Sequence, residues 1–232
     1  SVTRSVVVYY GEGHATALIR GFSSTNFKRR YYKMTARNLG YLNPSRTVFL
    51  LCDVQEKFRF MNYFPEVTKN IAKILQAGKV MEIPLVVTEQ NPEKLGKTIS
   101  ELDVKHSVGN YSKTKFSMVI PEVLESIEKA SKNVNSIVLF GLEAHICVEQ
   151  TALDLLALNK FGEIHIVADC VLSRTIGDRE FALKRLERLG CIVTTSENVI
   201  FKLVKDKNHP KFNDIRKLVT EPSIFPGLTN KL

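Results

Sequence analysis

Short apolar runs alternate with amphipathic helical patterns from residue 42 onward, and this alternation constrains the fold more than any other feature. Each run is four or five residues long, the length of a buried strand, and the segments between them repeat apolar residues every three or four positions. This order is typical of βαβ units, so we predict an α/β fold with three α/β/α layers and a mostly parallel, Rossmann-like sheet of six strands. The predicted strands are 48–51, 83–87, 104–108, 137–140, 164–167 and 191–194.

Two of the predicted helices have well-defined apolar faces. The first lies between the first and second strands, and the second ends at a Gly stop signal, Gly190. The faces expected to be buried are Val67, Ile71, Ile74, Leu75 and Gly78 in the first helix, and Phe181, Leu183, Leu186 and Leu189 in the second.

Composition sets the class of protein. With 232 residues and 44% hydrophobic content, the chain can bury one large core. No apolar run approaches the 18 or more residues of a membrane span, so we expect a soluble protein without a membrane partner. The four cysteines, Cys52, Cys147, Cys170 and Cys191, form no CxxC pair, which indicates reduced thiols and neither a disulfide framework nor a zinc site.

The net charge of +9 is concentrated at the N-terminus. Residues 1–40 hold seven Lys or Arg and one acidic residue, a balance of +6. Such a segment has the composition of a mitochondrial transit peptide. The alternatives are a disordered arm or an upstream extension before Met34. We expect one folded domain over 42–220, a tail over 221–232, and a mitochondrial or cytoplasmic location.

The run Gly141 to Val148 interrupts a buried strand and places Cys147 where a helix begins. At a helix N-terminus the unpaired amides and the positive end of the dipole favour a thiolate and can receive an oxyanion. The alternative is a cysteine that only fills space, since free cysteines are often buried.

Three chemically complementary side chains follow predicted strands. Asp53 follows the first strand, Lys113 the third and Cys147 the fourth. Ligands of an open parallel sheet bind beyond the carboxyl ends of its strands, so these side chains are expected on one rim. A carboxylate, an ammonium and a thiolate there suit acyl chemistry. Taken singly, each has a structural alternative. Asp53 could cap a helix, Lys113 could be a solvated loop charge, and Cys147 could be a core residue.

The linked motifs resemble one family. The stretches PSRTVFLLCDVQEKFR, KTKFSMVIPEV, VLFGLEAHICVEQTALDL and HIVADCVLSR, in this order, are similar to the isochorismatase-like cysteine hydrolase superfamily, and most to its eukaryotic isochorismatase-domain-containing proteins. The resemblance covers about residues 42–220. It implies an Asp53-Lys113-Cys147 triad, a cis peptide bond at Leu142–Glu143, and an oxyanion hole formed by the amides of Glu143 and Cys147.

Two departures from other branches of this superfamily narrow the chemistry. Nicotinamidases carry a histidine metal site after the first-strand aspartate, but here no histidine lies between Asp53 and His106, so no metal site is expected. True isochorismatases typically lack the cysteine. Since Cys147 is present, the resemblance implies attack on an amide or ester carbonyl of a small molecule, and we expect no cofactor. Lys115 is the nearest competitor of Lys113, but its spacing to Ser117 is less favourable.

Residues near the predicted rim are weaker candidates for lining a substrate pocket: Gln55, Phe58, Thr88, Glu89, Gln90 and His145. His145 lies two residues before the cysteine, but the family takes its base from aspartate, so a backbone-orienting role is expected for this histidine.

Two other function classes compete. The run Lys28-Arg29-Arg30-Tyr31-Tyr32-Lys33 mixes cations with aromatic rings, as in nucleic-acid binders, but the folded part shows no such motif and a nucleic-acid partner is not expected. The second alternative is a hydrolase fold that serves as a protein-interaction scaffold. The resemblance also implies a homo-oligomer, a dimer or tetramer.

Overall fold

The computed structural model describes residues 7–11, 14–18 and 39–223, which belong to two compact units, Ser1–Leu39 and Gly40–Leu232. In the first unit β1 (Val7–Gly11) pairs antiparallel with β2 (His14–Leu18). The remainder of the basic N-terminal segment and residues 224–232 of the tail lie outside the described residues. The transit-peptide, arm and upstream-extension interpretations therefore stay predictions.

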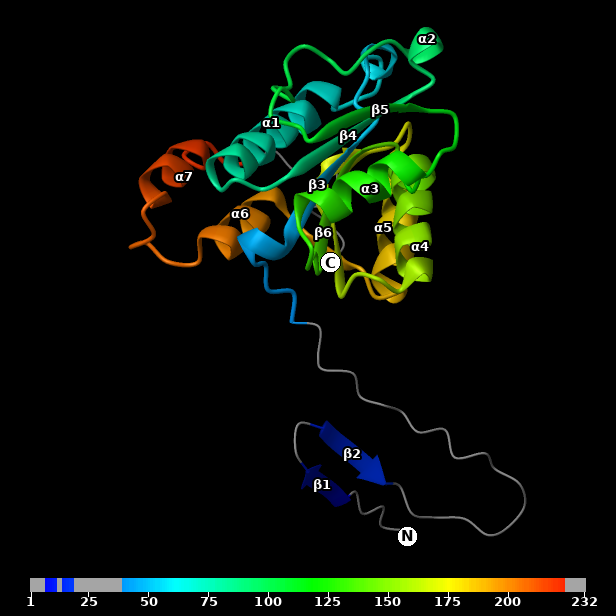
Figure 1. Cartoon of the computed structure of the whole chain (residues 1–232). Coiled ribbons are helices and arrows are strands. Elements are labelled where there is room, and N and C mark those ends of the chain that lie inside the picture. The colour runs from blue at the N-terminus through cyan, green and yellow to red at the C-terminus, as the bar shows by residue number, and fades with distance from the viewer. Residues whose placement is uncertain (1–6, 12–13, 19–38, 224–232) are drawn as a thin grey trace, which may run out of the picture. The chain divides into compact units, whose positions relative to one another are not determined.

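A six-stranded parallel sheet forms the centre of the second unit, in the order β5-β4-β3-β6-β7-β8 (Figure 1). The predicted α/β class is confirmed. Its strands are β3 (Thr47–Cys52), β4 (Leu85–Gln90), β5 (Gly109–Lys113), β6 (Ser136–Leu142), β7 (Glu163–Leu172) and β8 (Ile192–Thr194).

Helices cover both faces of this sheet (Figure 1). The helices α1, α6 and α7 contact one another on one face, while α3, α4 and α5 lie on the other. The α-helices are α1 (Phe64–Val80), α2 (Pro92–Leu95), α3 (Pro121–Ala130), α4 (Glu149–Leu158), α5 (Ile176–Arg188), α6 (Ser196–Val204) and α7 (Phe212–Leu218); shorter turns are η1 (Pro44–Arg46), η2 (Glu56–Phe58) and the π-helical η3 (Ala144–Val148). In α1, all five residues of the predicted apolar face are buried.

The strand order reverses between β3 and β6, the two central strands. The chain builds β4 and β5 on one side of β3, and β7 and β8 on the far side of β6. This is the switch point at which open α/β sheets bind ligands. Both strands are completely buried, since every residue of β3 and β6 belongs to the interior.

Gly141 allows β3 and β6 to meet at this point. Its φ is +122°, and a Cβ atom there would lie 2.0 Å from the carbonyl oxygen of Cys52. Only glycine tolerates both the backbone angle and the contact. The ends of the two central strands can therefore sit directly side by side.

The third strand was predicted in the wrong place. Residues 104–108 form a turn that includes a bond from the Ser107 amide to the Val104 carbonyl, and the strand is the more polar β5 that follows. An edge strand such as β5 takes its stability from the ladder with β4, so it needs no apolar run. Lys113 is the last residue of this strand.

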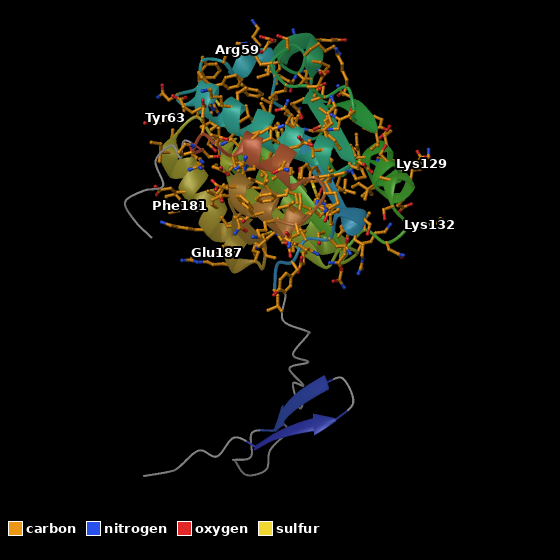
Figure 2. The ribbon with its side chains drawn as sticks, turned by 90° about the vertical axis from the view of Figure 1, so that its left-hand side faces the viewer. Arg59, Tyr63, Lys129, Lys132, Phe181 and Glu187 are labelled. Atoms are coloured by element: carbon orange, nitrogen blue, oxygen red, sulfur yellow. The ribbon has the colours of Figure 1, made fainter. Side chains whose placement is uncertain are left out.

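The predicted apolar face of α5 is partly wrong. Leu183 and Leu186 are buried, but Phe181 is 76% exposed and lies at the surface (Figure 2), and Leu189 is 47% exposed. Arg179 takes the inward position instead. Its guanidinium donates to the carbonyl oxygens of Val171 and Ala168 in β7, which offsets the cost of burying the charge.

Within the described ranges, none of the helices combines the length and the apolar character that crossing a membrane requires.

Replacing Gly141 with Ala is expected to lower the free energy of unfolding by roughly 3 kcal/mol or more, because the new Cβ meets backbone atoms of Cys52 at a φ that disfavours side chains. Denaturant unfolding followed by circular dichroism measures this loss. The matched control is Gly177→Ala in α5, where a Cβ has no neighbour closer than 3.9 Å and stability should stay the same or rise slightly. Equal stability of the two variants would contradict the close approach of β3 and β6.

Candidate active site

Asp53 directly follows β3 and is completely buried. Its backbone adopts the left-handed conformation with φ 51°, which aspartate tolerates better than most residues. The Thr88 hydroxyl, from the adjacent strand β4, donates to Asp53 Oδ1 at 2.8 Å. The amide of Asp53 donates to the Thr88 carbonyl oxygen at 3.1 Å. The carboxylate is thus held at the switch point by its neighbouring strand.

Lys113 reaches Asp53 from the far side of β4. Its side chain is 1% exposed, and its Nζ lies 2.6 Å from Asp53 Oδ2. Nζ also lies within 3.2 Å of Gln90 Oε1 and of the carbonyl oxygens of Lys115 and Phe116. An ammonium has three hydrogens, all of which these acceptors engage. Lys113 is therefore placed as a fixed positive charge beside the carboxylate.

The competing lysine lies elsewhere. The Lys115 ammonium donates to Asp154 Oδ2 at 2.7 Å and its side chain is 54% exposed. The structure places Lys113, and not Lys115, beside Asp53.

Cys147 lies in the π-helical turn η3, just before α4, and is 6% exposed. The peptide bond between Leu142 and Glu143 is cis, at the position that the family resemblance implies. The Thr151 hydroxyl donates to the Cys147 carbonyl oxygen at 2.6 Å and ties this turn to α4. The Cys147 sulfur and a carboxylate oxygen of Asp53 lie within 4.8 Å of each other.

A second thiol lies in the same place. The sulfur of Cys52, the last residue of β3, is also within 4.8 Å of both the Cys147 sulfur and the Asp53 carboxylate oxygen. Burial raises the pKa of Cys52 well above its usual range, and the contact with Cys147 and the Asp53 charge add to this shift. The Cys52 thiol is therefore protonated, and it donates to Asp53 Oδ2 at 3.5 Å.

These two thiols and the carboxylate are donor types that a soft divalent cation accepts. However, the ammonium of Lys113 already occupies one oxygen of Asp53 at 2.6 Å. A buried positive charge at this distance opposes a cation held by the same carboxylate. The charge arrangement therefore suits a thiol nucleophile better than a resident metal.

Two of the predicted pocket residues brace a loop instead. Gln55 is fully buried, and its amide group bonds to the backbone of Gln90 and Gly96. The Glu89 carboxylate accepts from the amide and hydroxyl of Thr98 and from Lys97. The polar atoms of Gln55 and Glu89 thus form hydrogen bonds within the protein, so the structure gives both side chains a structural role.

Gln90 connects this brace to the site. Its backbone amide donates to Gln55 Oε1, its Nε2 donates to the Thr114 carbonyl oxygen, and its Oε1 accepts from Lys113 Nζ at 2.8 Å. Gln90 thus orients the lysine. The sequence indicated that Gln90 lies near the rim, but not that it contacts Lys113.

The remaining candidates lie around the turn and on η2. His145 shares a 2.8 Å hydrogen bond between Nδ1 and the Ser173 hydroxyl, which joins η3 to the loop after β7. The Glu143 carboxylate accepts from Arg174 Nε at 3.3 Å. Phe58 is partly buried and packs against the core.

Sequence reasoning missed Cys52 as a site residue, and it named Thr88 as a pocket candidate without predicting its hydrogen bond to Asp53. Both are completely buried and end apolar stretches, so they look like core residues in the sequence. Their proximity to Asp53 depends on the pairing of β3 with β4. The one available signal was their position at the ends of apolar runs, on the side where Asp53 lies.

Asp53→Asn is expected to lower the free energy of unfolding by about 3–5 kcal/mol, because it leaves a buried ammonium without its counter-charge. The double variant Asp53→Asn with Lys113→Met should lose less than the sum of the two single losses. Chemical denaturation measures all three. The control is Asp103→Asn. Asp103 pairs with Lys79 at 2.7 Å, and both side chains are half exposed, so the loss of unfolding free energy should stay below about 1 kcal/mol. Strictly additive losses would refute a coupled buried pair.

The chain is 43% identical over 233 residues to isochorismatase domain-containing protein 1 of Danio rerio, covering 98% of this chain and 81% of the relative. It is 44% identical to isochorismatase domain-containing protein 2 of Xenopus laevis, covering 83% and 92% of the two chains.

Among solved structures, the MAR1 ribonuclease of Caenorhabditis elegans superposes with a TM-score of 0.77 at 38% identity, covering 83% of this chain and 98% of that one. The YcaC protein of Escherichia coli, described as an octameric hydrolase of unknown specificity, has a TM-score of 0.67 at 18% identity, covering 80% and 97%. A cysteine hydrolase of Pseudomonas syringae has a TM-score of 0.63 at 16% identity, covering 69% and 93%. The last two share the fold.

Residues 47–198 match the isochorismatase domain, a span that begins with β3 and ends in α6 and so contains Asp53, Lys113 and Cys147. Together with the relatives above 40% identity, this match shows that the chain belongs to the isochorismatase family.

Proposed function

We propose that this protein is a cysteine hydrolase that cleaves a C–N bond of amide type in a small molecule. The observation that carries the proposal is the convergence of Asp53, Lys113 and Cys147 at the switch point of the sheet, with the ion pair at 2.6 Å and the thiol within 4.8 Å of the carboxylate. A carboxylate at this distance can act as a general base towards the thiol, and the ammonium of Lys113 balances its charge.

In the proposed mechanism, Asp53 takes the proton of the Cys147 thiol and the sulfur attacks the amide carbonyl carbon. The backbone amides of Glu143 and Cys147 stabilise the oxyanion. When the C–N bond breaks, Asp53 returns the proton to the leaving nitrogen. A water molecule that Asp53 then deprotonates attacks the thioester, releasing the acid and restoring the cysteine.

Burial supports a small substrate. Cys147 is 6% exposed, while Asp53 and the Lys113 side chain are almost completely enclosed. Such a setting strengthens the electrostatic interactions on which this chemistry depends. It also admits a compact acyl group more readily than a polymer.

Cys147→Ala is expected to reduce hydrolysis of any accepted amide at least about a thousand-fold, because the nucleophile is lost. A panel of small primary amides, followed by released ammonia, identifies the substrate with the wild-type protein and then tests the variant. The melting temperature should change little.

The matched control is Cys191→Ala, which removes another buried thiol away from the site and should keep the wild-type rate. Undiminished hydrolysis by Cys147→Ala would rule out the cysteine mechanism.

A second candidate is ribonuclease activity, because the structurally similar Caenorhabditis elegans protein is named a MAR1 ribonuclease and shares 38% identity. The basic charge of this chain is compatible with RNA, which binds cations through its phosphates. Labelled single-stranded RNA incubated with the full chain, with and without Cys147→Ala, separates the two functions. RNA cleavage without amide hydrolysis would favour the second candidate.

We also propose that the protein forms a homo-oligomer. Several large apolar side chains are exposed, among them Phe181 at 76% and Tyr63 at 42%, both of which lie at the surface in Figure 2. The Escherichia coli protein with this fold is described as octameric. Light scattering on the full chain measures the mass, and a strictly monomeric value would reject the proposal.

A further inference from the structure

The mechanism proposed above gives no part to Cys52, although it is the second thiol of the site. Its sulfur lies within 4.8 Å of both the Cys147 sulfur and an Asp53 carboxylate oxygen. Cys52 ends β3, while Cys147 lies in the turn after β6, the adjacent strand. Two thiols from neighbouring strands thus face one carboxylate in a buried space.

The two thiols differ in their surroundings. Cys52 is completely buried, and its thiol donates to Asp53 Oδ2 at 3.5 Å. Cys147 keeps 6% of its surface exposed and lies in η3, two residues before α4 begins. A small reagent therefore reaches the Cys147 sulfur before the Cys52 sulfur. Cys52 is a protonated thiol next to the Asp53 carboxylate.

We propose that Cys52 and Cys147 form a peroxide-reactive dithiol, in which Cys52 converts the oxidised Cys147 into a reversible disulfide. The proposal rests on the proposed function only in taking Cys147 as the nucleophilic thiol of the site. Its consequence is a hydrolase that an oxidant switches off and a thiol reductant restores.

The chemistry balances with hydrogen peroxide as the only oxidant. The Cys147 thiolate attacks one peroxide oxygen, the O–O bond breaks, and the products are a sulfenic acid on Cys147 and hydroxide, which is protonated to water. Asp53 then accepts the proton of Cys52, and the resulting thiolate attacks the sulfenic sulfur. The S–S bond forms, the S–O bond breaks, and the departing hydroxide takes the proton from Asp53 and leaves as water.

The distance agrees with this reaction. A disulfide has an S–S length of about 2.05 Å, so sulfurs that start within 4.8 Å of each other approach by side-chain rotation and a small backbone adjustment. Cys170 and Cys191, the other two cysteines, do not belong to the group formed by Cys52, Asp53 and Cys147. Cys170 lies within β7, and Cys191 precedes β8, where burial raises its pKa to about 11. They serve as internal controls.

The test treats the full chain with hydrogen peroxide and maps its cysteines by mass spectrometry after alkylation and non-reducing digestion. The expected product is a peptide pair linked through Cys52 and Cys147, with the loss of two hydrogens and with Cys170 and Cys191 still alkylated. Dithiothreitol should then restore both thiols.

The deciding variant is Cys52→Ser, which keeps a hydroxyl donor for Asp53 and removes the resolving sulfur; Cys52→Ala is the second variant if the first fails to fold. In either, Cys147 should proceed to sulfinic acid, and the fraction of Cys147 that dithiothreitol recovers should fall at least about ten-fold below wild type. Cys191→Ser, the matched control, should recover as wild type does.

Three results would overturn the proposal: no Cys52–Cys147 linkage in the oxidised wild type, a linkage that involves Cys170 or Cys191 instead, or equal recovery in Cys52→Ser and wild type. The readout is the state of the thiols and not hydrolysis. A protein that forms the linkage but cleaves no amide therefore rejects the proposed function alone, while one that cleaves amides without forming the linkage rejects the dithiol alone.

Discussion

The buried ion pair between Asp53 and Lys113 is the interaction on which the rest of the site depends. Neither charge contacts bulk water, so each is held by the other and by hydrogen bonds from the Thr88 hydroxyl and to the Gln90 side chain. Such a pair gains little net stability, because desolvation offsets the Coulomb attraction. Its consequence is instead to place a carboxylate and its counter-charge in a dry space beside a thiol.

The fold assembles this pair from distant parts of the chain. The sheet order brings the ends of β3, β4 and β5 into one row, and Lys113 spans the width of β4 to reach Asp53. On the other side of β3, Gly141 lets β6 approach closely enough for the turn after it to bring Cys147 to the same point. The site is thus a consequence of strand order and of one glycine.

Much of the fold was predictable, because buried parallel strands are short apolar runs and their ends share one rim. The expectation of an apolar run failed for the edge strand β5, which is stabilised by its hydrogen-bonded ladder and not by apolar residues. The expected apolar face failed for α5, where Arg179 replaces Phe181 in the interior. The convergence of Asp53, Lys113 and Cys147 was predictable from their positions after strands. The proximity of Cys52 to this site was not predictable, because a cysteine that ends a buried strand has the same sequence pattern whether it only packs or also reacts.

Activation of Cys147 by the ion pair is tested most directly by the rate at which iodoacetamide alkylates each cysteine at neutral pH, mapped by mass spectrometry in the wild type, Asp53→Asn and Lys113→Met. If the ion pair activates Cys147, this cysteine reacts faster than Cys170 and Cys191, and either substitution slows it roughly ten-fold or more, because the thiol loses its base or the base loses its counter-charge. A Cys147 that reacts no faster than the other thiols, or whose rate neither variant changes, would contradict the claim that the ion pair activates the cysteine.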